Sequence, residues 1–302
     1  MRGAAIGCVA AAFLVVACSS SPASRPDTSG PRSTPAPSPS GLSQDFNNYG
    51  PCPEISIPGV AGRTGCLTAI PADLDGDGAP DQFEVFAQLG VNDMPTSWRV
   101  RAVLSTGPTP EQPIPTGAAA GGVRGVYPGA VGAVDANGDG RPEVFVKLAG
   151  ILYHVAGQHI LGIFDVTDGR IVPVQVRGQG RLEFVTGGAL SFGQGAACTT
   201  TDGAPVLDLY RVRKSTTERW SIRTAEYRWE GDELVPSGVR YQSKPVKAEA
   251  FDPSIAHLFE LRCGDIEVHV ALFMEPGPPG TAPGPPPPRA TRGPGRAPGG
   301  AR

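Results

Sequence analysis

The sequence lacks an apolar run of the roughly 18–20 residues that a membrane-spanning helix needs, which excludes a polytopic membrane protein. It also lacks an excess of positive charge. The segment 42–275 holds 19 Lys and Arg against 28 Asp and Glu, a net charge of −9, which argues against a nucleic-acid-binding protein. The same segment holds 30 of the 41 glycines, and this content favours many tight turns over long helices.

Signatures of catalysis are missing as well. There is no phosphate-binding Gly-Lys-Ser/Thr loop, no dinucleotide fingerprint and no zinc-protease helix. The segment 188–193 is one residue too long for a nucleophile elbow around Ser191. The scattered histidines are expected to be hydrogen-bonded or exposed; they are His154, His159, His257 and His269. The strand tryptophans Trp98, Trp220 and Trp229 are expected to pack in the core, and a sugar-binding site is the alternative. The sequence therefore predicts no enzyme.

The two ends of the chain differ in composition from the middle. Residues 19–41 contain 8 Ser and 6 Pro in 23 positions, and residues 276–302 contain 10 Pro and 7 Gly in 27. Such segments bury too little apolar surface to offset the entropy lost on ordering. We therefore expect a disordered tether over 18–41, one folded domain over 42–275 and a disordered tail over 276–302.

The first residues are typical of an exported protein. Arg2 precedes a stretch of small and apolar residues, which predicts a signal peptide over residues 1–17. The stretch ends in Val-Val-Ala-Cys at Cys18, which resembles the bacterial lipobox, where the cysteine is lipidated. The resemblance implies an extracytoplasmic protein, lipid-anchored to the bacterial cell membrane through Cys18. The alternative is an ordinary signal peptide that happens to contain this cysteine.

Cysteine usage agrees with export. Four cysteines remain once Cys8 leaves with the signal and Cys18 carries lipid, and an even number predicts two disulfides. Their spacings do not suit zinc. Three pairings are possible, and we favour Cys52–Cys66 together with Cys198–Cys263.

The middle of the chain repeats. Asp77, Asp139 and Asp202 each begin an Asp-Gly-x-Pro sequence, and they lie 62 and 63 residues apart. A further period reaches the alternating stretch 264–270. Because one period holds about four strands with their turns, we expect an all-β domain made of one repeated unit.

Two loops, 73–81 and 135–143, place acidic or amide side chains at alternate positions around a glycine. Such a loop can aim several oxygens inward, and Ca²⁺ takes about six to eight oxygen ligands. The first loop also satisfies the EF-hand pattern, with Glu84 last, but its flanks are strand-like and Pro80 lies inside it. A second alternative is that both loops are turns without a metal.

The loop pattern, between strands and with a period near 60, resembles the FG-GAP and VCBS repeats. Repeats of those families form β-propeller blades that carry Ca²⁺ in the turn between the first two strands of a blade. The resemblance implies one ion held by Asp73, Asp75, Asp77, Asp81 and the Ala79 carbonyl, and a second held by Asp135, Asn137, Asp139, Glu143 and the Arg141 carbonyl. The third repeat has Cys198, Thr200 and Ala204 at ligand positions, so its loop is expected to be metal-free.

The expected architecture is a propeller-like array of about four blades. Residues 42–65 would add strands to the last blade and thereby close a ring. An open β array or a β-sandwich with calcium loops is the alternative.

These features indicate a surface-displayed, lipid-anchored, calcium-binding module without catalytic activity. Its partner would be a protein or a glycan of the cell envelope. An envelope hydrolase on a β scaffold is the alternative, although no catalytic group of residues can be named for it.

Overall fold

A computed structural model of the protein describes residues 51–114, 125–153, 156–189, 191–215, 218–246 and 254–268. These residues all belong to the unit Asp45–Arg302. The unit Met1–Gln44 and the C-terminal segment 269–302 lie outside the described residues. The expectations about the signal peptide, Cys18, the tether and the tail therefore concern residues that the structure does not describe.

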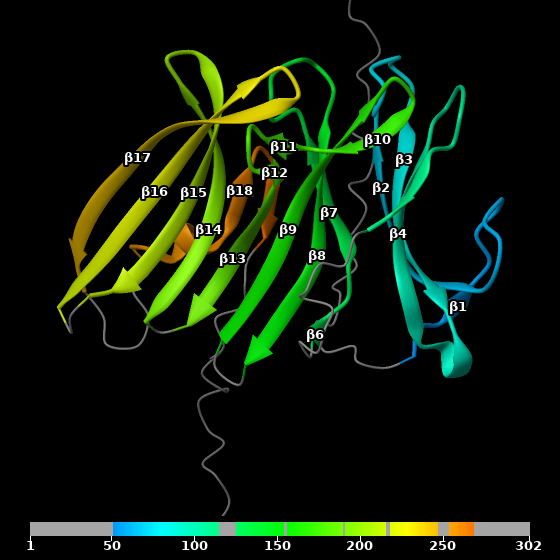
Figure 1. Cartoon of the computed structure of the whole chain (residues 1–302), viewed down its shortest axis with the longest axis horizontal. Helices are drawn as coiled ribbons and strands as arrows, with labels where there is room; N and C mark the ends of the chain where they lie inside the picture. The colour runs from blue at the N-terminus through cyan, green and yellow to red at the C-terminus, as the bar shows by residue number, and fades with distance from the viewer. Residues whose placement is uncertain are drawn as a thin grey trace, which may run out of the picture. The chain divides into compact units, whose positions relative to one another are not determined.

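Strands make up most of the described residues, which confirms the all-β prediction (Figure 1). The helical elements among these residues are short 3₁₀ turns, η1 (Val91–Asp93) and η3 (Ala256–Phe259). No helix in the described ranges is long and apolar enough to cross a membrane.

Three successive segments of the chain fold as four-stranded antiparallel meanders. The first contains β2 (Thr64–Ala72), β3 (Asp81–Leu89), β4 (Pro95–Val103) and β5 (Glu111–Pro113). The second contains β7 (Gly129–Val134), β8 (Glu143–Tyr153), β9 (Ala156–Thr167) and β10 (Arg170–Pro173). The third contains β14 (Phe192–Thr201), β15 (Ala204–Lys214), β16 (Arg219–Glu230) and β17 (Glu233–Pro245). In each meander the Asp-Gly-x-Pro segment joins the first two strands.

A fourth period supplies the hairpin of β18 (Leu261–Cys263) and β19 (Ile266–Val268). Strand β18 pairs in parallel with β14, and the side chain of Ile266 lies against Gly132 of β7. The hairpin therefore contacts the first strands of both the second and the third meander.

The remaining strands extend the meanders or join them into open sheets. They are β1 (Glu54–Ile55), β6 (Gly125–Val126), β11 (Gln175–Val176), β12 (Gly180–Arg181) and β13 (Glu183–Ala189). Strand β13 pairs with both β9 and β14, so the second and third meanders share one 14-stranded sheet. The first meander and β1 form a separate five-stranded sheet.

The described strands form open sheets and do not confirm the expected ring of four separate blades. Strand β13 joins two meanders edge to edge, whereas propeller blades are separate sheets around a channel. Strand β1 pairs with β2 of the first meander, so this described part of the segment 42–65 adds to the first repeat and not to the last. The coarser prediction of an array of β repeats agrees with these open sheets.

Apolar side chains pack between the repeats. The rings of Phe83 and Phe164, from the first and second meanders, lie 6.3 Å apart in one hydrophobic cluster. Trp98 belongs to the same cluster, and Trp220 packs edge-on against Phe259 under η3. These two tryptophans are buried, as core packing requires.

Both favoured disulfides are present in the structure. Cys52–Cys66 spans 14 residues, and Cys198–Cys263 spans 65 and links β14 to β18. The loop-entropy model gives contributions of about 3 and about 4 kcal/mol, respectively. Two bridges indicate an oxidising, extracytoplasmic environment.

Candidate metal centre

The first Asp-rich loop joins β2 to β3 and is held by its own carboxylates. Asp73 accepts hydrogen bonds from the backbone amides of Gly76, at 2.9 Å, and of Gly78, at 3.0 Å. Asp75 accepts one from the amide of Asp77, at 3.2 Å. Gly76 and Gly78 have φ values of 78° and 86°, in the left-handed region that glycine adopts most easily. The glycines thus let the chain curl around the acidic side chains.

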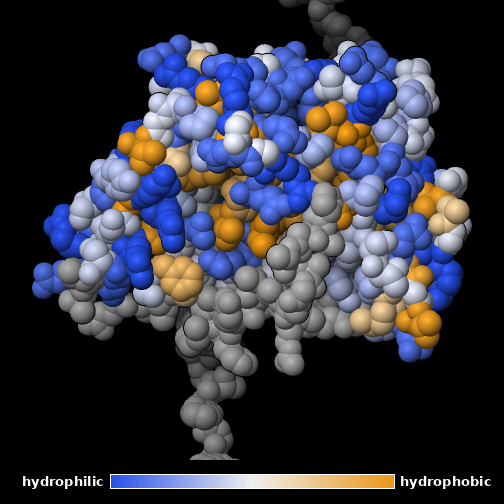
Figure 2. Space-filling model, in the orientation of Figure 1, coloured by the Kyte–Doolittle hydropathy of each residue, from blue (hydrophilic) through white to orange (hydrophobic). Residues whose placement is uncertain are grey.

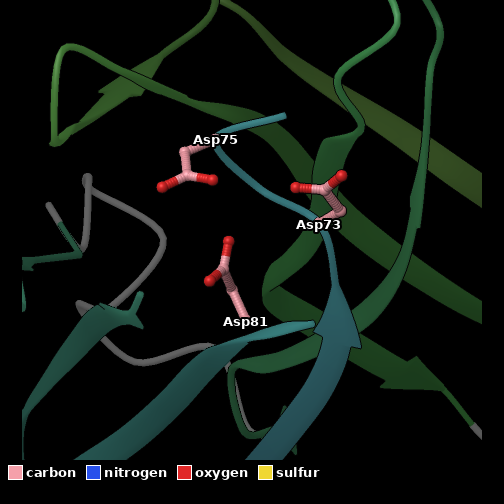
Figure 3. A group of neighbouring side chains, drawn as sticks. All are labelled: Asp73, Asp75 and Asp81. Carbon is pink, nitrogen blue, oxygen red and sulfur yellow. The ribbon is translucent and has the colours of Figure 1, made fainter. Parts of the chain in front are cut away.

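Three carboxylates of this loop converge on one point. Asp73, Asp75 and Asp81 each offer an oxygen, and the three oxygens lie within 4.8 Å of one another (Figure 3). Asp81 is buried and accepts hydrogen bonds from the backbone amides of Leu74, at 2.8 Å, and Ser105, at 2.6 Å. Carboxylates so close together repel one another, and a bound cation would remove that repulsion.

Asp77, the fourth acid of this loop, is engaged outside the group. Its carboxylate accepts hydrogen bonds from the hydroxyls of Ser105, at 3.0 Å, and Thr106, at 3.1 Å. It also accepts one from the amide of Ala79, at 2.7 Å. The bonds from Ala79 and Ser105 lower the pKa of Asp77. This side chain therefore ties the loop to the turn after β4.

The second loop, between β7 and β8, repeats the pattern position by position. Asp135 accepts hydrogen bonds from the amides of Gly138, at 2.6 Å, and Gly140, at 3.0 Å. Asn137 accepts one from the amide of Asp139, at 2.8 Å. At the ninth position, Glu143 accepts one from the amide of Ala136, at 2.7 Å, as Asp81 does from Leu74. The two loops therefore share one backbone design.

The electrostatics of the second loop differ. Glu143 is 1% exposed, and desolvation raises its pKa to about 8, with the nearby carboxylate of Asp165 adding to the effect. The guanidinium of Arg141 lies 2.8 Å from a carboxylate oxygen of Asp139. Among the described residues, this loop does not bring three ligand-forming carboxylates together as the first loop does. It combines three acids and the Asn137 amide with an arginine nearby.

The third loop is an exposed two-residue turn. Asp202 and Gly203 both have positive φ, and the side chain of Asp202 is 86% exposed. It forms an ion pair with Arg228, at 3.7 Å.

The three loops lie next to one another. A Cβ at Gly76 of the first loop would be 3.1 Å from the stem of Arg141 in the second. A Cβ at Gly138 of the second loop would be 3.6 Å from Pro205 in the third. The repeats therefore present their Asp-Gly turns in one row.

No family model matches the chain, and neither the curated proteins nor the solved structures compared with it give a match.

Several contacts of the Asp-rich loops were not predicted from the sequence. Ser105 and Thr106 come from a different turn. Asp165 comes from β9, next to Phe164, which pairs with Val144 of β8, and its charge acts on Glu143. Nothing in the Asp-rich motif itself points to these residues. Only the register of β8 and β9 would have placed Asp165 near Glu143.

A buried polar pair lies in the same sheet. Lys147 of β8 and His159 of β9 are both buried, and desolvation lowers their pKa values to about 8 and about 4. His159 of β9 lies opposite Thr186 of β13 in the antiparallel pairing of these two strands. His257 is half-buried, and His154 and His269 lie outside the described residues.

A shallow cavity of about 350 Å³ lies where the third meander meets β18. Tyr210, His257, Arg262 and Glu267 line it, beside Cys198 of the second disulfide. Arg262 and Glu267 form an ion pair at 3.3 Å. Polar groups around a half-buried tyrosine are the kind of lining that can bind a hydroxyl-rich ligand.

Proposed function

We propose that the protein is a calcium-binding module that works outside the cytoplasmic membrane. The convergence of Asp73, Asp75 and Asp81 carries this proposal. All the predicted ligands are oxygen atoms, and an oxygen-only set suits Ca²⁺ better than zinc or copper. The loop-forming hydrogen bonds use only part of the accepting capacity of each carboxylate, which leaves oxygen lone pairs for an ion.

The second loop is proposed as a weaker site. Its buried Glu143 carries an ionisation cost that a bound cation would offset. Its three acidic ligands, with Arg141 beside them, provide less negative charge than the four acids of the first loop, and ligand charge sets affinity in calcium loops. The carbonyls of Ala79 and Arg141 remain predicted ligands.

The assignment to repeats of the FG-GAP and VCBS type is part of the same proposal. It is supported by the position of the Asp-rich loops, which join the first two strands of successive meanders. A propeller-like arrangement remains a proposal for the chain as a whole.

We further propose that Cys18 carries lipid and that the module binds an envelope protein or glycan without catalysing a reaction. The cavity beside Tyr210 is a candidate for the glycan. If Cys18→Ala, with normal signal processing, left the protein equally membrane-bound at high salt, where contacts between charged residues and lipid are screened, the lipid anchor would be refuted.

Thermal unfolding with and without calcium tests the metal proposal. Extracellular modules bind Ca²⁺ with Kd of about 10⁻⁴–10⁻³ M, and calcium at about ten times Kd stabilises by about 1.4 kcal/mol per site. We expect a higher Tm in calcium than in EDTA, and bound calcium by elemental analysis. Asp202→Asn is the matched control, because it removes an Asp-Gly acid outside the metal loops. A Tm indifferent to calcium, with no bound metal, would reduce both loops to ordinary turns.

A further inference from the structure

The third meander exposes a basic face on strands β14 to β17. Cross-strand pairing aligns Phe192, Arg213, Ser221 and Ser243 in one row and Gln194, Arg211, Arg223 and Tyr241 in the next. Directly opposite residues in antiparallel strands project from the same side of the sheet. All of these residues except half-buried Gln194 are exposed, and neither row contains an acid.

The arginines of this face lie close together although their like charges repel one another. Arg211 lies directly opposite Arg223, and like charges in that position destabilise a sheet. Within the described ranges, neither these two nor Arg213 forms an ion pair, whereas Arg177 pairs with two glutamates. Such an arrangement in a domain of net negative charge indicates a surface adapted to an external anion.

Large apolar and aromatic side chains flank the arginines. Phe192 is 41% exposed, Val239 47% and Tyr241 74%. Val239 lies opposite Ala225, in the row next to Tyr241 on the same side of the sheet. In Figure 1 these strands form one end of the large sheet, and hydrophilic residues cover most of the same region in Figure 2.

We propose that this face docks on an anionic phospholipid bilayer. Arginine pairs bidentately with phosphate, and exposed aromatic rings favour the boundary between headgroups and acyl chains. A broad sheet face suits a planar surface, whereas a soluble polyanion would need the charges but not the apolar side chains. Docking is independent of the calcium sites. A lipid at Cys18 would hold the face near the membrane and strengthen it.

The contribution of each arginine can be bounded. A basic residue near an anionic membrane surface strengthens binding about fivefold. Removing three of them should therefore weaken binding roughly a hundredfold at low salt, and added salt should shrink this difference.

The test compares full-length chains that carry Cys18→Ala, with EDTA present to exclude calcium bridging. Binding is measured to phosphatidylglycerol-containing vesicles and to pure phosphatidylcholine vesicles. The ratio of the two binding affinities separates recognition of lipid charge from any apolar contribution of the N-terminal segment. The test variant is the triple Arg211→Gln, Arg213→Gln, Arg223→Gln. The control variant, Arg292→Gln, Arg296→Gln, Arg302→Gln, loses the same charge from the C-terminal segment.

We expect the triple variant on the sheet to lose the preference for anionic vesicles, and the control and the corresponding triple Lys variant to keep most of it. Tyr241→Ser should weaken binding by a smaller factor. Equal losses in the sheet and control variants would overturn the proposal. So would a wild-type chain that binds soluble polyphosphate through these arginines but ignores anionic vesicles. An unchanged Tm in the triple variant shows that the fold is intact.

Discussion

The two Asp-rich loops have the same hydrogen-bond pattern and different charges. Both use a first-position aspartate to bind two glycine amides, and both bury a ninth-position acid under the loop. The first loop gathers three carboxylates, whereas the second has Asn137 in place of Asp75 and Arg141 in place of Ala79. The comparison teaches that the loop shape and the proposed metal affinity are set by different residues.

The fifth-position acids show how the loops are anchored. Asp77 binds hydroxyls from the turn after β4, whereas Asp139 binds the guanidinium of Arg141 from its own loop. Arg141 also donates to the carbonyl of Val166 at the end of β9. The first loop is thus tied to its meander by neutral donors, and the second by a cation.

The largest difference is expected in the pH dependence of the metal-free protein. The pKa of Glu143 is raised by folding, so its contribution to stability is present below the unfolded pKa, near 4.5, and is lost as pH rises to about 8. A shift of this size corresponds to about 3–5 kcal/mol. In EDTA, Glu143→Gln should therefore be more stable than wild type at pH 8 and similar to it near pH 4.5. Urea unfolding at both pH values measures the difference.

The comparison with Glu143→Gln is needed because His159 acts in the opposite direction. Its pKa falls to about 4 on folding, so its contribution grows as pH rises toward 6.5. Both proteins contain His159, and its effect cancels in the difference. A difference that does not change with pH would show that Glu143 ionises normally in the fold.

The next largest effect is a loss of stability, expected when the ninth-position acid of the first loop is replaced by its amide. Asp81→Asn keeps one carbonyl oxygen for two backbone amides, those of Leu74 and Ser105. One amide is left unpaired in a buried position, so we expect a loss of about 1–3 kcal/mol in EDTA at pH 7. Glu143→Gln keeps a carbonyl oxygen for the amide of Ala136 and should show no such loss. Chemical denaturation of the two variants side by side decides the point.

Exchanging the third-position residues tests the metal proposal without disturbing the backbone. Asp75→Asn keeps an oxygen for the amide of Asp77, and Asn137→Asp keeps one for Asp139. We expect the first change to remove about 1.4 kcal/mol of calcium-dependent stabilisation and the second to add a similar amount. Tm in calcium and in EDTA measures both. Equal calcium responses in wild type and both variants would contradict the proposed ligand role.

The smallest effect concerns Arg141. Arg141→Ala copies Ala79 of the first loop and removes the cation beside the second. Because this group is partly exposed, we expect calcium stabilisation to rise by only about 0.5 kcal/mol. Arg141→Lys, which keeps the charge, serves as the control and should not show the rise. Calcium titration of the Tm gives the comparison.

Local features could be predicted from the sequence because they depend on neighbouring residues. The turn glycines, the acids that bind their own loop amides and the strands on either side all follow from short patterns. The orientation of Asp77 could not be predicted, since Ser105 lies 28 residues away on another turn. Strand β13 joins the second and third meanders through partners chosen by tertiary packing, which no period in the sequence encodes. The arginine face likewise exists only in the register of β15 and β16.

The C-terminal hairpin has a consequence for the order of folding. Each meander pairs strands that are close in the sequence and can form as soon as its own residues are available. Strand β18, in contrast, pairs with β14, and its Cys263 bonds to a cysteine 65 residues earlier. The hairpin also fills space against Gly132, more than 130 residues before Ile266 along the chain. The second and third meanders must therefore wait for the end of the domain to be synthesised before their shared core is complete. A chain that stops short of β18 would expose that core. Docking of this hairpin is therefore the step that completes the fold of the domain.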